Sequence, residues 1–176
     1  MKKVIFASSS GGHLTELLRM EKLFNEYNYL IVTEKTDVTK KLSEKYNIKY
    51  MMYGSRFYPL KYFFVLIYNV IKSICIILGF KPDTIVSTGA HTGGIMCFIA
   101  HIFKVKVIYI ETLAMTEELS VTGKNMYKIA CGSGCEVENA CTIEFDDDTV
   151  VELSAKKWHQ VIKAGLVACG YPSDLN

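Results

Sequence analysis

The chain has 176 residues, of which 50% are hydrophobic and 22% are charged. This length suits one domain, and so much apolar material excludes a disordered chain. The 20 basic and 18 acidic residues give a net charge of +2 without a basic run, which argues against nucleic-acid binding. A cleft between two full α/β domains would require a second chain.

The first residues resemble a signal peptide only superficially. Met1–Lys3 is basic, but the apolar stretch Val4–Ala7 is too short for the hydrophobic region of a signal. We therefore expect a chain without a secretion signal, with reduced thiols in a cytosolic compartment. The cysteines in question are Cys75, Cys97, Cys131, Cys135, Cys141 and Cys169.

Short apolar runs alternate with helical patterns through the first 110 residues. The expected strands are Lys3–Ala7, Tyr29–Thr33, Ile48–Tyr53, Thr84–Ser87 and Val105–Ile110. The expected helices are His13–Tyr27, with Leu14, Leu17, Leu18, Leu23 and Phe24 on one face, then Asp37–Tyr46, Tyr58–Phe80 and Thr92–Phe103. The Val/Ile-rich strands lack clean alternation, which predicts a parallel sheet covered on both faces. Right-handed crossovers then give a doubly wound α/β fold.

The character of the sequence changes near residue 130, which predicts a first domain over 1–130 and an atypical small C-terminal tail over 131–176. Cys131–Cys135 is typical of a linker. Thr142–Phe145 and Thr149–Leu153 flank three aspartates and predict a hairpin, and Ser154 starts a short helix through Ala164. We expect no metal site, because the cysteine spacings and the aspartates lack the usual zinc and calcium patterns.

A glycine pair follows the first expected strand and leads directly into a helix. Glycines let a ligand approach the backbone, and the first N–H groups of a helix attract an anion. The segment therefore predicts a phosphate or diphosphate site, with a tight turn and a surface histidine as the alternative. It lacks both the G-x-G-x-x-G pattern and the P-loop lysine, so NAD binding and ATP hydrolysis are not expected. The residues are Ser9, Ser10, Gly11, Gly12 and His13.

A second glycine-rich loop follows the fourth expected strand. Ligands of doubly wound sheets bind at the carboxyl ends of the strands, so the two loops together predict one anion-binding cleft. The alternative is that both are simple turns. The residues of the second loop are Thr88, Gly89, His91, Thr92, Gly93 and Gly94.

Two residues are candidates for acid–base chemistry at this edge. Glu111 ends the fifth expected strand, where a carboxylate can orient a sugar hydroxyl or assist proton transfer. The alternative for Glu111 is a solvated strand end. His13 is the other candidate, with a stronger claim to ligand binding than to catalysis.

The long apolar stretch Tyr58–Phe80 is interrupted by few polar residues. At 100° per residue, Lys61 and Lys72 lie about 20° apart on a helix, with Tyr68 beside them and Asn69 at the edge of the stripe. A narrow polar stripe on a wide apolar face favours a helix in the membrane interface over a spanning one. The alternative is a buried crossover helix or a protein interface. The expected membrane residues are Arg56, Phe57, Tyr58, Lys61, Phe63, Phe64, Ile67 and Lys72.

Several segments together follow the pattern of one family. They are Ser9-Ser10-Gly11-Gly12-His13-Leu14-Thr15-Glu16, Val32-Thr33-Glu34-Lys35, Tyr53-Gly54-Ser55-Arg56, Pro82-Asp83, Ser87-Thr88-Gly89-Ala90-His91-Thr92-Gly93 and Tyr109-Ile110-Glu111-Thr112. From Met1 to about Ala130 the chain resembles the bacterial capsular and exopolysaccharide family of glycosyltransferase accessory subunits. The eukaryotic relative of that family is the membrane subunit of the N-acetylglucosaminyltransferase that acts on dolichol-diphosphate-GlcNAc. Residues 131–176 do not follow the family pattern.

The resemblance implies a split enzyme of the GT-B class. This chain would be its Rossmann-like, N-terminal, acceptor-side half, and a partner glycosyltransferase subunit would bind the UDP-sugar donor. Residues 10–13 and 88–94 would hold the diphosphate and first sugar of a polyprenyl-diphosphate-linked acceptor at the cytoplasmic face of the membrane. Neither a resident cofactor nor a metal is implied, since helix N-termini can stabilise the departing diphosphate.

Two other functions stay open at this stage. One is a self-sufficient small glycosyltransferase or phosphate-handling enzyme that uses His13 and Glu111. The other is a scaffold that only recruits a transferase to the membrane. A donor-binding signature would favour the self-sufficient enzyme, and the sequence carries no downstream glutamate-rich nucleotide loop.

Overall fold

The computed structural model describes residues 1–55, 57–111, 121–126, 129, 132–137, 140–145 and 150–154. They form one eight-stranded sheet of order β3-β2-β1-β4-β5-β6-β7-β8. β1 to β6 run parallel, and β7 and β8 add two antiparallel strands. The strands are β1 (Lys3–Ser8), β2 (Asn28–Glu34), β3 (Ile48–Met51), β4 (Thr84–Gly89), β5 (Lys106–Glu111), β6 (Gly132–Val137), β7 (Ala140–Phe145) and β8 (Val150–Ser154).

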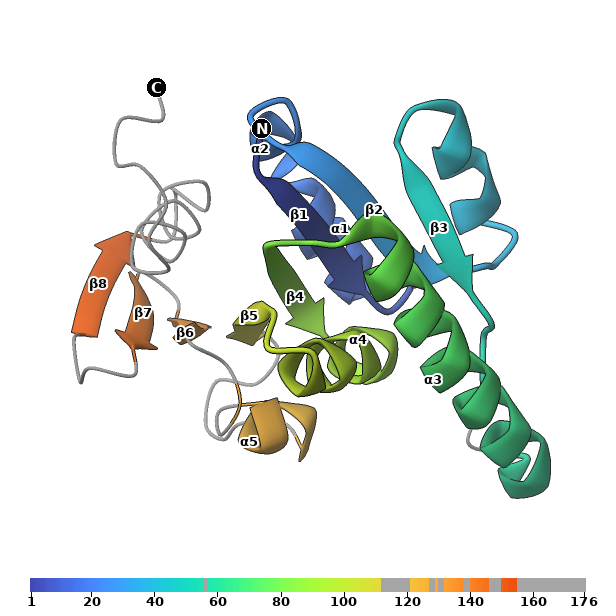
Figure 1. Cartoon of the computed structure of the whole chain (residues 1–176). Coiled ribbons are helices and arrows are strands. Elements are labelled where there is room, and N and C mark those ends of the chain that lie inside the picture. Colours follow the sequence, from blue (N-terminus) through green and yellow to red (C-terminus); the bar gives the residue numbers. More distant parts are fainter. Residues whose placement is uncertain are drawn as a thin grey trace.

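Helices cover both faces of the parallel part of the sheet (Figure 1). The helices are α1 (Gly12–Leu18), α2 (Glu21–Phe24), the 3-10 helix η1 (Thr39–Glu44), α3 (Pro59–Phe80), α4 (His91–Ile102) and α5 (Val121–Met126). In β1, Val4 and Phe6 pack on the side of α1 and α2, and Ile5 and Ala7 pack on the side of α3 and α4. The period-2 alternation of side chains thus fills two cores. The predicted doubly wound, Rossmann-like fold is confirmed.

The prediction of one helix over His13–Tyr27 is wrong, because the segment forms α1 and α2 with a break between them. In a continuous helix, Leu14 and Leu23 would be nine residues apart and about 180° apart around the axis. Both are buried in the same core. The break at Arg19 and Met20 turns both side chains toward the sheet, and Met20 itself is fully buried.

The predicted helix Asp37–Tyr46 is instead the shorter η1. Thr36 and Thr39 compete with regular helical hydrogen bonds at its start. The Thr39 hydroxyl donates to the Glu34 carbonyl at 2.6 Å, and the Thr36 N–H donates to the Thr39 hydroxyl at 2.9 Å. Hydroxyls that bond to the local backbone disfavour a regular α-helix. The strand predictions are confirmed, although β3 ends at Met51 instead of Tyr53.

In the tail, the linker prediction is wrong, because Gly132–Val137 is the strand β6 and pairs in parallel with β5. The predicted hairpin is confirmed by the antiparallel pair β7 and β8. The three aspartates and the helix expected after Ser154 lie outside the described residues. The tail cysteines have no described side chains. The division of the chain near residue 130 stays a prediction.

Candidate site at the carboxyl ends of the strands

The two glycine-rich loops lie side by side, because β1 and β4 are neighbours in the sheet. The Ser9 N–H donates to the Gly89 carbonyl at 2.8 Å, and the Thr92 N–H donates to the Ser9 hydroxyl at 3.0 Å. Residues 83 positions apart in the chain thus share one hydrogen-bonded unit. The sheet brings together the two segments that the sequence proposed as one cleft.

His13 and Thr88 bond to one another across the two loops. His13 Nδ1 donates to the Thr88 carbonyl at 2.9 Å, and the Thr88 hydroxyl donates to the His13 carbonyl at 2.8 Å. The first contact fixes the ring and protonates Nδ1, since a carbonyl only accepts. Nε2 is therefore the ring nitrogen available to a ligand. Thr88 is buried and holds the loops together instead of facing solvent.

Glu34, at the end of β2, ties both loops to the sheet. Its Oε2 accepts hydrogen bonds from the Ser10 hydroxyl at 2.7 Å and the Ser10 N–H at 3.2 Å. Its Oε1 accepts one from the Thr92 hydroxyl at 2.8 Å. The residue is 5% exposed, so these bonds satisfy a nearly buried carboxylate. Sequence reasoning did not assign Glu34 to the site. An acidic residue that ends an apolar strand at this edge is the signal, and the same signal selected Glu111.

The glycines of the two loops serve different purposes. Gly11 has φ of +94°, and a Cβ built on Gly11 or Gly12 meets no atom within 4 Å. Their backbone is therefore open to a ligand, and both residues are exposed. In the second loop, a Cβ on Gly89 would lie 2.8 Å from the Tyr109 hydroxyl, and one on Gly93 would overlap the Ser87 hydroxyl. These glycines permit close packing beneath the site.

The remaining predicted site residues lie at varied depths. Ser9, Thr92, Gly93 and Gly94 are buried, and Ser10 is half-buried. His91 is half-buried and is the first residue of α4, not a residue of the preceding loop. Glu111 ends β5 as expected, and its side chain lies outside the described residues. The described part of the site therefore presents Ser10, Gly11, Gly12, His13 and His91 toward solvent.

One face of α3 is apolar and exposed beside this edge. Its exposed side chains, preceded in the chain by Phe57 and Tyr58, include Leu60, Phe63, Phe64, Ile67 and Ile71. The first turns of α3 project beyond the ends of the strands (Figure 1). By length and composition, α3 could cross a membrane, with an 18-residue window of mean hydropathy 2.2. Arg56 lies outside the described residues.

The polar residues of α3 do not form the single solvent-facing stripe that the sequence predicted. Lys61 is exposed and Lys72 is half-buried, but Asn69 and Ser73 are fully buried. Asn69 Nδ2 donates to the Met52 carbonyl at 2.9 Å, and the Met52 N–H donates to Asn69 Oδ1 at 2.9 Å. Asn69 keeps its predicted place beside the lysines around the helix, but it is buried, because its amide bonds to backbone groups that follow β3.

Solved structures with this fold include MurG and a UDP-N-acetylglucosamine 2-epimerase. MurG of Acinetobacter baumannii superposes with a TM-score of 0.62 and 15% identity over 76% of this chain and 41% of that chain. UDP-N-acetylglucosamine 2-epimerase of Rickettsia bellii superposes with a TM-score of 0.60 and 14% identity, over 99% of this chain and 43% of that chain. The chain spans less than half the length of either enzyme, and at these identities the likeness shows the fold alone.

Sequence comparison identifies the family, through a match that spans most of the chain. A mouse protein named UDP-N-acetylglucosamine transferase subunit ALG14 is 27% identical over an alignment 150 positions long, and the match covers 69% of this chain and 69% of the mouse protein. The family described as "Oligosaccharide biosynthesis protein Alg14 like" matches residues 4–133, which include the glycine loops, Glu34 and α3. The chain belongs to this Alg14-like family of oligosaccharide biosynthesis proteins.

Proposed function

We propose that this chain is the membrane-associated, acceptor-binding subunit of a two-chain glycosyltransferase that acts on a polyprenyl-diphosphate-linked sugar. One observation carries the proposal. The open backbone of Gly11 and Gly12 and the Nε2 side of His13 lie at one sheet edge, joined to the second loop by Glu34. Backbone N–H groups and an imidazole suit an anionic diphosphate.

A partner chain would supply the UDP-sugar donor. The relative in mouse is named a subunit, and both solved enzymes are more than twice as long as the matched part of this chain. In the proposed reaction, an acceptor hydroxyl oxygen bonds to the anomeric carbon of the donor, the bond from that carbon to UDP breaks, and a base takes the hydroxyl proton. His13 and Glu111 are the candidates in this chain for that base.

The biological setting is also part of the proposal. On the resemblance of its motifs, the subunit would act in capsular or exopolysaccharide repeat-unit synthesis at the cytoplasmic side of the cell membrane. The exposed apolar face of α3 supports membrane association, because an amphipathic helix buries such a face at the boundary of headgroups and acyl chains.

The first experiment is a calorimetric titration of the detergent-purified chain with UDP-GlcNAc, UDP-galactose and UDP-glucose. We expect no saturable binding by the folded chain alone, and sugar transfer only after the donor-binding partner is added. Saturable binding of a UDP-sugar by the isolated chain would contradict the split arrangement and favour the self-sufficient enzyme. Transfer that is unchanged by Gly12→Val would count against the diphosphate site.

The membrane part of the proposal has its own test. The paired change Phe63→Glu and Ile67→Glu places two charges on the exposed face of α3, where neither side chain belongs to the core. We expect the variant to stop sedimenting with membranes. Continued sedimentation of the folded variant would favour α3 as a protein interface instead.

A further inference from the structure

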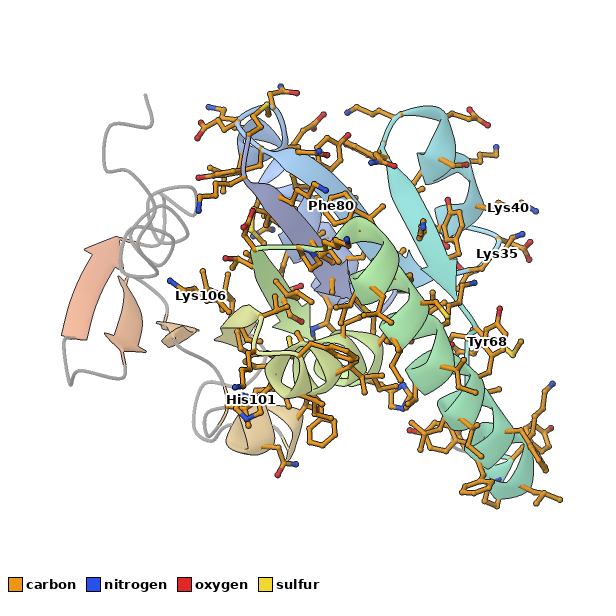
Figure 2. The ribbon with its side chains drawn as sticks, viewed as in Figure 1. Lys35, Lys40, Tyr68, Phe80, His101 and Lys106 are labelled. Carbon is orange, nitrogen blue, oxygen red and sulfur yellow. The ribbon has the colours of Figure 1, made fainter. Side chains whose placement is uncertain are left out.

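A pocket lies on the same sheet edge, outside the glycine loops. It has a volume of about 550 Å³ and is lined by Lys35, Tyr50, Met51, Met52, Tyr53, Tyr68 and Lys72, which we call the lysine pocket. These residues come from the ends of β2 and β3 and from α3. Lys35 and Tyr68 lie on the same flank of the molecule (Figure 2).

The lysine pocket holds two positive charges that no described carboxylate neutralises. Neither Lys35 nor Lys72 takes part in the ion pairs of Lys40 with Asp37 and of Lys45 with Glu21. The nearest acid in the chain, Glu34, turns its carboxylate toward Ser10 and Thr92. The pocket therefore combines two ammonium groups with the Tyr68 hydroxyl and without an acid in its lining, a donor set that suits a phosphate group. The Tyr50 hydroxyl does not belong to this donor set, because it donates to the Thr39 carbonyl at 2.7 Å.

The walls of the pocket are already ordered. Lys72 Nζ lies 3.3 Å from the Tyr68 hydroxyl and 5.3 Å from the centre of the Tyr68 ring, which holds the ammonium against the helix. Asn69 binds both backbone groups of Met52 and so fixes the opposite wall to α3. On the α3 side of the pocket, a ligand would therefore meet groups that need little ordering.

The position of the pocket on α3 indicates the source of that phosphate. Viewed down the axis of α3, the exposed apolar side chains from Leu60 to Leu78 lie on one face of the helix. The buried residues Val65, Asn69 and Ser73 lie on the opposite face, about 180° from the middle of the apolar face. Tyr68 and Lys72 lie between these two faces, about 100° from the apolar centre. When the apolar face lies among acyl chains, groups at that angle are level with lipid headgroups.

We propose that the lysine pocket binds the phosphate of an anionic phospholipid whose acyl chains contact the exposed face of α3. The inference rests on the membrane association of the proposed function. It adds a specific headgroup site to that association, separate from the site at the glycine loops. The site would fix the rotation of the chain about α3 on the bilayer, because the pocket lies on only one side of the exposed apolar face.

The test is co-sedimentation of the full chain with vesicles of phosphatidylcholine alone and with phosphatidylglycerol added. Each lysine near an anionic surface strengthens vesicle binding about fivefold, so we expect the unchanged chain to prefer the anionic vesicles by at least about tenfold. The double variant Lys35→Ala with Lys72→Ala should lose that preference. Lys22→Ala with Lys41→Ala is the matched control, since it removes the same charge from exposed positions outside the pocket. The control should keep the preference, and Lys35→Arg with Lys72→Arg should restore it.

Equal losses in the pocket variant and the control would overturn the proposal, because net charge alone would then explain the preference. A pocket variant that still prefers anionic vesicles would also overturn it. Inorganic phosphate that abolishes the preference at constant ionic strength would show a site for soluble phosphate instead of lipid. The change of Phe63 and Ile67 to glutamate separates the two proposals, since it should abolish binding to both kinds of vesicle, whereas the pocket variant should still bind neutral ones.

Discussion

Glu34 shows how one side chain can organise a site without facing the ligand. Its carboxylate is nearly buried, and its three hydrogen bonds come from Ser10 and Thr92, which belong to different loops. Hydrogen bonds to a charged group are stronger than those between neutral groups, and a buried donor left without its acceptor is costly. Glu34 is therefore a positioning residue for both loops.

We expect Glu34→Ala to lower the free energy of unfolding by about 3 kcal/mol, because it leaves the donors of Ser10 and Thr92 without their acceptor. Glu34→Gln should lose less, about 1 kcal/mol, since the amide oxygen still accepts from Ser10 and the Thr92 hydroxyl can rotate to accept from the amide N–H₂. Denaturant unfolding of both variants measures the difference. An unfolding midpoint of Glu34→Ala equal to that of the unchanged chain would show that Glu34 is not a structural link.

The two kinds of glycine give a matched pair of variants. Gly12→Val should leave the unfolding midpoint nearly unchanged, because its Cβ enters open space, and should abolish acceptor use by blocking the approach to the backbone. Gly93→Val should destabilise the fold by about 2 kcal/mol or more, because its Cβ overlaps the Ser87 hydroxyl. Thermal unfolding and transfer assays with the partner chain separate the two effects. Unfolding of the Gly12 variant would assign that glycine to the fold.

The residues of the site were only partly predictable from sequence. The rule that ligands meet strand ends was enough to select residues 9–13 and 88–94, and the sheet brings them together. The sequence could not show that Thr88 and Thr92 are buried while Gly11 is open. That distinction depends on the pairing of β1 with β4, which are far apart in the chain. Glu34 follows its predicted strand just as Glu111 does, and it was not assigned because its bonds to Ser10 and Thr92 depend on contacts between distant segments.

At the scale of elements, α3 has two apolar faces with opposite roles. One packs on the sheet through Ile76 and Ile77, and the other is exposed. Periodicity predicted the helix correctly. It could not tell the buried face from the exposed face, because both are apolar. Which of them is buried depends on the side of the helix that contacts the sheet. Asn69 marks the buried side by its bonds to Met52.

We expect Asn69→Leu to destabilise the chain by about 2–4 kcal/mol, even though it makes α3 more apolar. The change removes the partners of the Met52 N–H and carbonyl groups, and it inserts a branched side chain where an amide fitted. Lys61→Leu is the control, because its side chain is exposed and should change the midpoint little. Chemical unfolding of both variants tests this. A stabilised Asn69→Leu variant would show that hydrophobicity, not backbone pairing, governs this position.

At the scale of the whole molecule, the sheet continues into the tail. The described residues of both hydrophobic cores precede residue 130, but β6 covers the edge of β5 by parallel pairing. The sequence indicated a change of character there and suggested a linker. The linker was predicted from the glycines and the serine of residues 131–135, and local composition does not show that a segment pairs with a strand of the sheet.

Removal of residues 131–176 should therefore leave a chain that unfolds cooperatively, because both described cores remain. It should also leave the edge of β5 bare, and we expect self-association through unpaired backbone groups. Circular dichroism during heating and light scattering during gel filtration measure the two effects. Loss of cooperative unfolding would show that the tail completes the core. A monomeric truncated chain would show that the edge of β5 is protected by another route.

The hydrogen bonds of the glycine loops also have a consequence for how the chain folds. They join residues that are 24, 58, 75 and 83 positions apart, whereas α3 and α4 form from neighbours in the chain. Contacts between distant residues require the ordering of long loops first, which slows their formation. During refolding, helical signal should therefore return before the environment of His13 becomes native. The site is completed only when β1, β2 and β4 have all taken their places, so ligand binding reports the last stage of folding.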